Sequence, residues 1–268
     1  MKIVLWIGNG ANQKAFANKL NSLYPISTIF IESRKKKKTL QLSKVITKIL
    51  DLTIFHSIHR AWNNLMSYYN ETFPRLPEVK CFCVSNINDE SVYNETSKIN
   101  PDLILVSGTS LIKEDLLKIH STYGIMNLHT GLSPYIKGGP NCTNWCISTL
   151  QIHLIGNTIM WIDKGIDSGN IITSELTQFN GNETLNEIHL KVMEHAHELY
   201  INAVNKVIKG NIQGIPQNNL VTGKTYYTKH WGIKQKFNLL FNIKKFKSIV
   251  LSDSYKFEQS KVTTVNLN

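Results

Sequence analysis

The sequence lacks any run of about 18 uninterrupted apolar residues, the length that a membrane-spanning helix requires. Only six apolar residues precede the two glycines of the opening MKIVLWIGNG, and no small-residue cleavage site follows them. This opening is too short for the core of a secretion signal and is typical of a buried first strand. We therefore expect a cytoplasmic protein that has no membrane partner.

Cysteine is also scarce, with four residues in 268. They form a C-x-C pair, Cys81 and Cys83, and a C-x-x-x-C pair, Cys142 and Cys146. Neither spacing matches the common structural zinc sites, and a disulfide framework needs more cysteines in a shorter secreted chain. We expect no metal site, and buried free thiols in a reducing compartment.

The composition is otherwise that of an ordinary folded protein, with 42% hydrophobic and 18% charged residues. At roughly 100–200 residues per domain, this length allows one large domain, or one domain with a small appendage. The 30 Lys and Arg residues outnumber the 19 Asp and Glu residues by 11, which favours anionic partners such as phosphates, nucleotides or polyacids.

Continuous apolar runs alternate with segments of helical spacing along the first half of the chain. The predicted strands are Lys2–Gly8, Ile26–Glu32, Val79–Ser85, Leu103–Gly108 and Gly124–His129. The predicted helices are Ala11–Leu23, Asp89–Ile99 and Lys113–Ile119. Because these strands are apolar throughout, we expect helices to cover both of their faces. The pattern predicts an α/β fold with a doubly wound, mostly parallel sheet.

A segment from about residue 34 to residue 78 interrupts this alternation, and we predict a helical insertion there. It opens with the basic run Arg34–Lys38, which is typical of a solvated loop, with a contact to phosphate or another acidic group as the alternative. We interpret Trp62, Tyr68 and Tyr69 as packing of the inserted helices rather than as a platform for stacking bases.

The second half of the chain adds two predicted strands, Thr158–Ile162 and Ile171–Gln178, on either side of a turn rich in Gly and Asp. A capping-box pattern at Thr184–Glu187 then opens a long helix, which Gly210 is expected to end. We divide the chain into a main domain at 1–210 and a basic, aromatic extension at 211–268.

The first strand ends in Gly8-Asn9-Gly10, which is two thirds of a dinucleotide-binding fingerprint. The third glycine of that fingerprint is replaced by Gln13, and an acid such as Glu32 ends many second strands. We interpret this segment as a tight strand-to-helix turn whose amides can face a phosphate, rather than as a nicotinamide site.

Asn127 and His129 lie two apart on a predicted strand, so their side chains share one face of the sheet. They occupy its C-terminal end, where open α/β sheets bind ligands. Downstream, Asp167 lies in the Gly- and Asp-rich loop. An amide, an imidazole and a carboxylate together form an acyl-transfer set, because the first two stabilise an oxyanion and the third holds the imidazole charged. The alternative is a capped strand end without catalytic function.

Two longer segments extend this pattern: NLHTGLSPYIKG at 127–138 and DKGIDSGNII at 163–172. Both resemble signatures of the 10-formyltetrahydrofolate-dependent formyltransferase family, and the helix opening at Thr184 is similar too. The resemblance spans roughly residues 2–216 and is weakest over 34–78. It implies a formyltransferase or Rossmann-like sheet with a short C-terminal α/β extension.

The resemblance implies that Asn127, His129 and Asp167 are catalytic, that 10-formyltetrahydrofolate is the co-substrate, and that neither a metal nor a covalent enzyme intermediate takes part. The implied folate-binding residues are Val106, Ser107, Gly108, Asp163, Lys164, Gly165 and Ile166. The sequence departs from the family pattern at Thr130-Gly131, at Lys137 in place of Arg, and at Met160 in place of a further histidine.

The segment GKTYYTKHW at 223–231 resembles the tail of the sugar-nucleotide N-formyltransferases. This likeness implies an acceptor such as a dTDP- or UDP-linked amino-dideoxyhexose, as used in lipopolysaccharide O-antigen biosynthesis, and a possible homodimer. The implied acceptor-binding residues are Gly8, Asn9, Lys137, Tyr226 and Trp231. Alternatives are formylation of methionyl-tRNA or a purine precursor, a formyltetrahydrofolate deformylase, and a catalytically silent binding protein. We do not expect a nucleic-acid partner, and the tail could instead be a hydrophobic β-hairpin.

Overall fold

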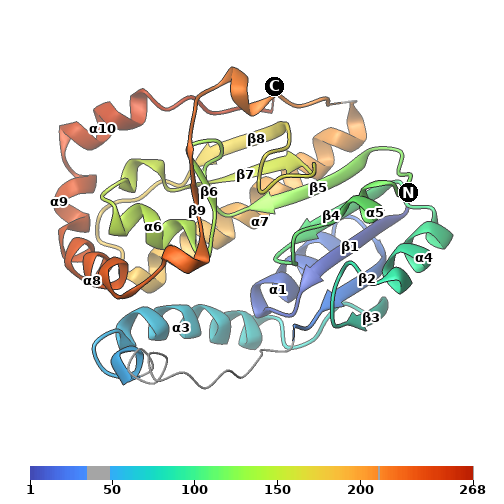
Figure 1. The fold of residues 1–268 in the computed structure, drawn as a ribbon, viewed down its shortest axis with the longest axis horizontal. Coiled ribbons are helices and arrows are strands. Elements are labelled where there is room, and N and C mark those ends of the chain that lie inside the picture. Colours follow the sequence, from blue (N-terminus) through green and yellow to red (C-terminus); the bar gives the residue numbers. More distant parts are fainter. Residues whose placement is uncertain (35–48, 211, 268) are drawn as a thin grey trace.

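The computed structural model describes residues 1–34, 49–210 and 212–267. The strands are β1 (Ile3–Gly8), β2 (Ile26–Glu32), β3 (Lys80–Val84), β4 (Leu103–Ser107), β5 (Gly124–His129), β6 (Ile136–Gly138), β7 (Gly156–Trp161), β8 (Ile171–Leu176) and β9 (Lys224–Tyr226). The helices are α1 (Ala11–Asn21), α3 (His56–Thr72), α4 (Glu90–Ile99), α5 (Glu114–Leu117), α6 (Cys142–Ser148), α7 (Leu185–Lys209), α8 (Ile233–Asn242), α9 (Phe246–Val250) and α10 (Asp253–Ser260). Figure 1 shows their arrangement. No helix in the described ranges is long and apolar enough to cross a bilayer.

Seven strands form one sheet in the order β3-β2-β1-β4-β5-β7-β8. The first five of these are parallel to one another, whereas β7 runs antiparallel to both β5 and β8. The strand order reverses direction between β1 and β4, which is the point where such sheets bind ligands. The predicted doubly wound, mostly parallel sheet is therefore confirmed.

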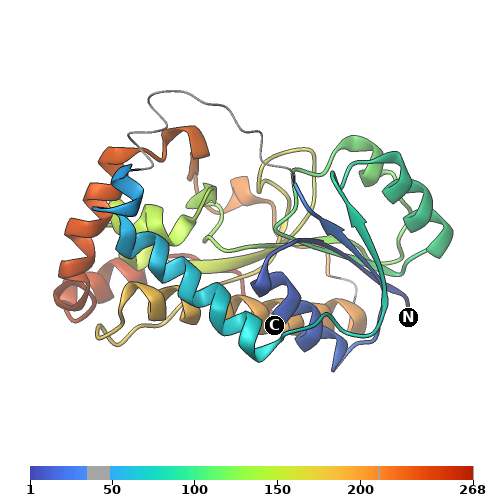
Figure 2. The same ribbon diagram turned by 90° about the horizontal axis from the view of Figure 1, so that it is seen from below.

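Helices cover both faces of the sheet, which explains why its central strands are apolar throughout. Every residue of β1 and of β4 is buried. Helices α1, α3 and α7 lie on one face, and α4 and α5 on the other (Figure 2). Helix α3 lies within the crossover that parallel pairing of β2 with β3 requires.

Helix α7 begins at the predicted capping box. The Thr184 hydroxyl accepts a hydrogen bond from the Glu187 backbone N–H at 3.4 Å, and the Glu187 carboxylate accepts one from the Thr184 N–H at 2.8 Å. The helix runs to Lys209, with Gly210 as its C-cap, as predicted. Its buried face packs against the centre of the sheet.

Two predictions about individual side chains need correction. Cys142 and Cys146 are buried free thiols, but Cys81 and Cys83 are exposed because β3 is the outermost strand of the sheet. Tyr69 is fully buried as expected, whereas Trp62 and Tyr68 are 37% and 43% exposed. Residues Lys35–Lys38 of the basic run lie outside the described residues.

Residues 212–267 of the extension, the part that the structure describes, do not form the β-hairpin that was the alternative. Their strand β9 pairs in parallel with β6, and helices α8, α9 and α10 follow. These helices share one hydrophobic core with α6 and the first half of α7. The last described residues return to the main sheet, where the Ser174 N–H donates to the Val265 carbonyl at 2.8 Å. The division at residue 210 stays a prediction.

Candidate active site

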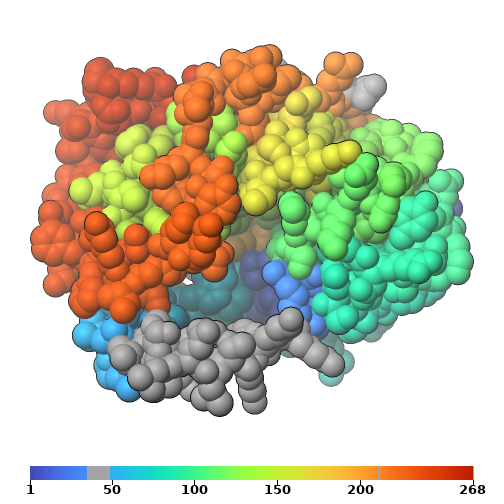
Figure 3. All heavy atoms as spheres, in the orientation of Figure 1, coloured from blue at the N-terminus to red at the C-terminus, as the bar shows by residue number. Residues whose placement is uncertain are grey.

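A cavity of about 990 Å³ opens at the C-terminal ends of β1, β4 and β5. Figure 3 views the molecule from this side, with the loop before β8 in yellow and the β9 segment in orange. Twelve of the residues predicted to form the site line it: Gly8, Asn9, Val106, Ser107, Gly108, Asn127, His129, Asp163, Gly165, Ile166, Asp167 and Tyr226. Lys137, Lys164 and Trp231 are not among the lining residues. A volume of this size suits a drug-sized or larger ligand.

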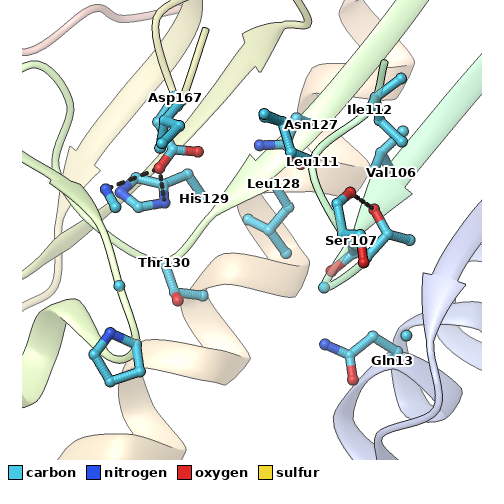
Figure 4. A pocket seen from close by; sticks show the side chains of 18 of the residues that line it. Gln13, Val106, Ser107, Leu111, Ile112, Asn127, Leu128, His129, Thr130 and Asp167 are labelled. Atoms are coloured by element: carbon cyan, nitrogen blue, oxygen red, sulfur yellow. Dashed lines mark hydrogen bonds and ion pairs between the residues drawn. The ribbon is translucent and has the colours of Figure 1, made fainter. Parts of the chain in front are cut away.

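Asn127 and His129 reach the cavity from one face of β5. Asn127 lies in the middle of the sheet, paired with Val106 of β4 and Met160 of β7. In Figure 4 the side chains of Asn127, His129 and Asp167 converge on the same space. His129 Nδ1 lies 3.3 Å from Asp167 Oδ2, and its Nε2 lies 3.0 Å from the Ile136 carbonyl oxygen.

Asp167 is held at an unusual backbone geometry in the loop between β7 and β8. Its φ is +48°, a left-handed conformation that Asp tolerates better than most residues. Its Oδ2 also accepts a hydrogen bond from the Gly138 N–H at 2.9 Å. Its Oδ1 has no hydrogen-bond partner among the described residues, so this oxygen is available to a ligand.

The buried imidazole of His129 is protonated in this setting. Burial by itself lowers the pKa of His129, but the Asp167 charge, the Cys142 sulfur and the Ile136 carbonyl raise it to about 10. Both ring nitrogens face acceptors, so the doubly protonated ring has a partner for each N–H. The site therefore presents a neutral amide and a cation close to a carboxylate.

The walls next to these groups come from β4 and from the loop before β8. A Cβ atom at Gly8 would collide with the Gly108 carbonyl oxygen, so the glycine is required by the close approach of β1 and β4. Lys164 does not line the cavity; its side chain is largely exposed and pairs with Glu114 at 2.9 Å.

The tail residues predicted to bind the acceptor through their aromatic rings are packed mainly against other side chains of the protein. Tyr226 is 5% exposed, its hydroxyl donates to Gln151 Oε1 at 2.9 Å, and its ring lies 4.6 Å from that of Trp145. Trp231 packs edge-on against the same Trp145 ring. Tyr227, which follows Tyr226 in the sequence, also lines the cavity and is 44% exposed. Sequence spacing could not distinguish these neighbours.

Among the lining residues that lie outside the predicted set, Glu32, Arg34 and Trp62 are notable for their contacts or their exposure. The Glu32 carboxylate is fully buried, accepts the backbone N–H groups of Ile87 at 3.0 Å and Ser110 at 2.6 Å, and pairs with Arg34 Nε at 3.1 Å. Arg34 also donates to the Gly108 carbonyl at 3.0 Å, while its side chain stays 57% exposed. Trp62 lines the cavity from α3. For Glu32, the only signal was an acid at the end of the second strand.

The arrangement is suited to reactions at a carbonyl group. An amide donor and a cation can stabilise a developing oxyanion, and a carboxylate with a free oxygen can accept a proton. Within the described part of the chain, no three His, Cys, Asp or Glu side chains are grouped so that they could hold a metal ion.

Comparison with known proteins extends over most of the chain. A family model described as formyl transferase matches residues 1–204. The methionyl-tRNA formyltransferase of Clostridium tetani is 30% identical over 127 residues, which are 47% of this chain and 40% of that enzyme. The match thus spans less than half the length of that curated relative.

Solved structures share the fold over a larger part of the chain. A sugar N-formyltransferase from a Shewanella species aligns with a TM-score of 0.58 and 13% identity, covering 90% of this chain and 87% of the other. An N-formyltransferase from Helicobacter canadensis, solved with folinic acid and dTDP-3-aminofucose, gives a TM-score of 0.57 and 14% identity, with 91% and 81% coverage. Since the family model covers 204 of the 268 residues, the chain belongs to the formyl transferase family.

Proposed function

We propose that this protein is an N-formyltransferase that moves a formyl group from 10-formyltetrahydrofolate to the amine of a nucleotide-linked amino sugar. The observation that carries the proposal is the meeting of Asn127 with the His129–Asp167 pair in one large cavity. Family membership supports the reaction class, and the geometry supports these three residues as its catalytic groups.

The reaction begins when the acceptor amine attacks the formyl carbon, and the carbonyl electron pair moves to the formyl oxygen. The Asn127 amide donates a hydrogen bond to this oxyanion. Both N–H groups of His129 already face protein acceptors, so the His129 cation stabilises the oxyanion through its charge. Both groups act more strongly on the tetrahedral intermediate than on the substrate carbonyl, which lowers the barrier.

Collapse of the intermediate requires one proton to move. The attacking nitrogen becomes a cation, and the free Oδ1 of Asp167 accepts its proton directly or through one water molecule. The carboxylate then delivers that proton to N10 of the folate as the bond between N10 and the formyl carbon breaks. The products are the formamide and tetrahydrofolate, so no oxidant, reductant or covalent enzyme intermediate is needed.

The folate donor is assigned to the wall built from Val106–Gly108 and from the loop that contains Asp163, Gly165 and Ile166. These residues line the cavity next to Asn127. Glu32 is the last residue of β2, and its buried carboxylate accepts a hydrogen bond from the Ser110 N–H in the chain after β4. The same carboxylate pairs with Arg34. These contacts keep the donor wall in place. Lys164, whose side chain pairs with Glu114, stays an untested prediction here.

The acceptor is assigned to the remaining part of the cavity, where Gly8, Asn9, Trp62 and Tyr227 contribute to the lining. Partly exposed aromatic rings can stack on a nucleobase, and the half-exposed Arg34 can face a diphosphate. The fold-level likeness to sugar N-formyltransferases covers 90% and 91% of the chain, so it reaches beyond residues 1–210 into the extension, which also favours a sugar nucleotide. Lys137, Tyr226 and Trp231 stay predictions, as do a homodimer and a role in O-antigen biosynthesis.

A panel of acceptors tests the proposal. The full chain would be incubated with 10-formyltetrahydrofolate and, separately, with dTDP- and UDP-linked amino-dideoxyhexoses, methionyl-tRNA, a purine-precursor amine, or no acceptor. We expect tetrahydrofolate and a formylated sugar nucleotide in equal amounts. Release of formate without an acceptor would identify a deformylase instead, and formylation of methionyl-tRNA alone would contradict the sugar acceptor. A chain that consumes no donor in any arm refutes the proposed reaction.

A further inference from the structure

Residues 214–217, at the start of the extension, lie against the loop that carries Asp167. Ile215 and Ile171 exchange two backbone hydrogen bonds, each 2.8 Å long, which fix this segment beside the first residue of β8. Gln217 follows two residues later and is only 8% exposed. Its side chain is therefore aimed inward, toward the loop, from a part of the chain that the family model does not reach.

The Gln217 amide nitrogen makes two short hydrogen bonds to this loop. It donates to the Asp167 carbonyl oxygen at 2.7 Å and to the Gly169 carbonyl oxygen at 2.9 Å. Both of its N–H groups are thus used, and they join the two carbonyls that flank Ser168. A side chain that binds two carbonyls of one tight turn restricts the dihedral angles between them.

This restriction matters because Asp167 occupies a disfavoured conformation. With φ at +48°, its backbone needs support from its surroundings to stay in the left-handed region. The same conformation directs Asp167 Oδ2 at His129 Nδ1, 3.3 Å away, and at the Gly138 N–H, 2.9 Å away. Any relaxation of the loop would therefore lengthen the contact between the carboxylate and the imidazole.

We propose that Gln217 is a positioning residue, which holds the Asp167 loop so that its carboxylate faces His129. This inference rests on the proposed function and assigns the extension a part in completing the catalytic centre. Gln217 carries no charge, so it acts only through the position of Asp167. The ionisable groups that face His129 are Asp167 from the loop and Cys142 from α6, whose sulfur lies 3.6 Å from Nε2.

The test substitutes Gln217→Met, which keeps the side-chain length but removes both donors. Its matched control is Gln213→Met, because Gln213 belongs to the same segment and is exposed. We expect the Gln217 variant to lose about 10-fold or more in kcat, as two lost hydrogen bonds imply, with KM for both substrates nearly unchanged. As the pH rises, the variant should also lose activity at a lower pH than the wild type, because the His129 imidazolium is less stabilised by a displaced Asp167 carboxylate.

A nuclear magnetic resonance titration of His129 gives a readout that does not depend on turnover. We expect the His129 pKa to be lower in the Gln217→Met protein than in the wild type and the control. A variant that only loses thermal stability, with wild-type kcat, pH profile and His129 titration, overturns the inference. If the Met variant does not fold, Gln217→Asn replaces it, and wild-type values in that variant overturn the inference equally. A wild-type chain without formyl transfer would instead refute the proposed function, while the titration would still test the positioning.

Discussion

Replacing Asp167 with asparagine is the most direct test of the electrostatics of the site. The substitution keeps the size of the side chain and leaves an oxygen that can accept from the Gly138 N–H, which now lies 2.9 Å from Asp167 Oδ2. It removes the negative charge that lies 3.3 Å from His129 Nδ1. The change therefore separates the charge of Asp167 from its shape.

The expected size of the effect follows from the pKa of His129. Burial lowers this pKa, yet the surroundings, with Asp167 the only carboxylate among them, raise it from 6.5 to about 10. That difference corresponds to on the order of 5 kcal/mol in favour of the imidazolium. Without the carboxylate, burial is opposed only by the Cys142 sulfur and the Ile136 carbonyl, so the pKa of His129 should fall. A smaller fraction of the rings is then charged at about pH 8, and kcat should fall by about 100-fold or more.

The assay is the rate of formyl transfer between pH 5.5 and pH 10 for the wild type, Asp167→Asn and a control, Asp115→Asn. The control removes an equal charge from an exposed residue whose ion-pair partner is Lys118, three positions away on the surface. Activity that needs a charged imidazole is present below its pKa and lost above it, so the alkaline limit should move to lower pH in the Asp167 variant alone. Wild-type kcat at about pH 8, or an unmoved alkaline limit, would refute the reasoning.

Two further predictions concern other residues. Asn127→Ala should lower kcat by about 100-fold, because the variant loses a hydrogen-bond donor to the oxyanion. Initial rates measure this effect, and a folate titration should show little change in folate binding. A fall in folate affinity with normal kcat would contradict this. Burial lowers the pKa of His189 to about 4 and that of His197 to about 3, so both rings are neutral when folded. Their contribution to stability is complete above pH 6.5 and is lost as the pH falls through the folded values, because the unfolded chain binds these protons first. Denaturant unfolding measures the free energy of unfolding at pH 7 and at pH 4.5. The decrease between these pH values should be smaller in the double variant His189→Leu/His197→Phe than in the wild type, and an equal decrease would count against this account.

The sequence was informative wherever a local pattern has one physical solution. Apolar runs such as Ile26–Glu32 and Gly124–His129 match the observed strands, because a strand covered on both faces tolerates only apolar residues along most of its length. The Thr184–Glu187 pattern likewise places the start of α7, since the capping box is made by residues three apart. Asn127 and His129 share a face because side chains alternate along a strand.

The sequence was less informative wherever the partner lies far away along the chain. Nothing local distinguishes buried Tyr226 from the exposed Tyr227, because the difference depends on the packing of Tyr226 against the ring of Trp145. The exposure of Cys81 depends on the position of β3 at the sheet edge, which strand patterns do not reveal.

The amino-acid sequence by itself determined the α/β class and the parallel strands, because the periodicity of apolar residues specifies them. It offered Asn127, His129 and Asp167 as candidate site residues through the resemblance to a known family. The tertiary structure alone decided that Asp167 lies beside His129, that Glu32 binds the Ser110 N–H, and that Gln217 binds the Asp167 carbonyl. These contacts join residues 38 to 78 positions apart, and only the folded chain brings such residues within hydrogen-bonding distance.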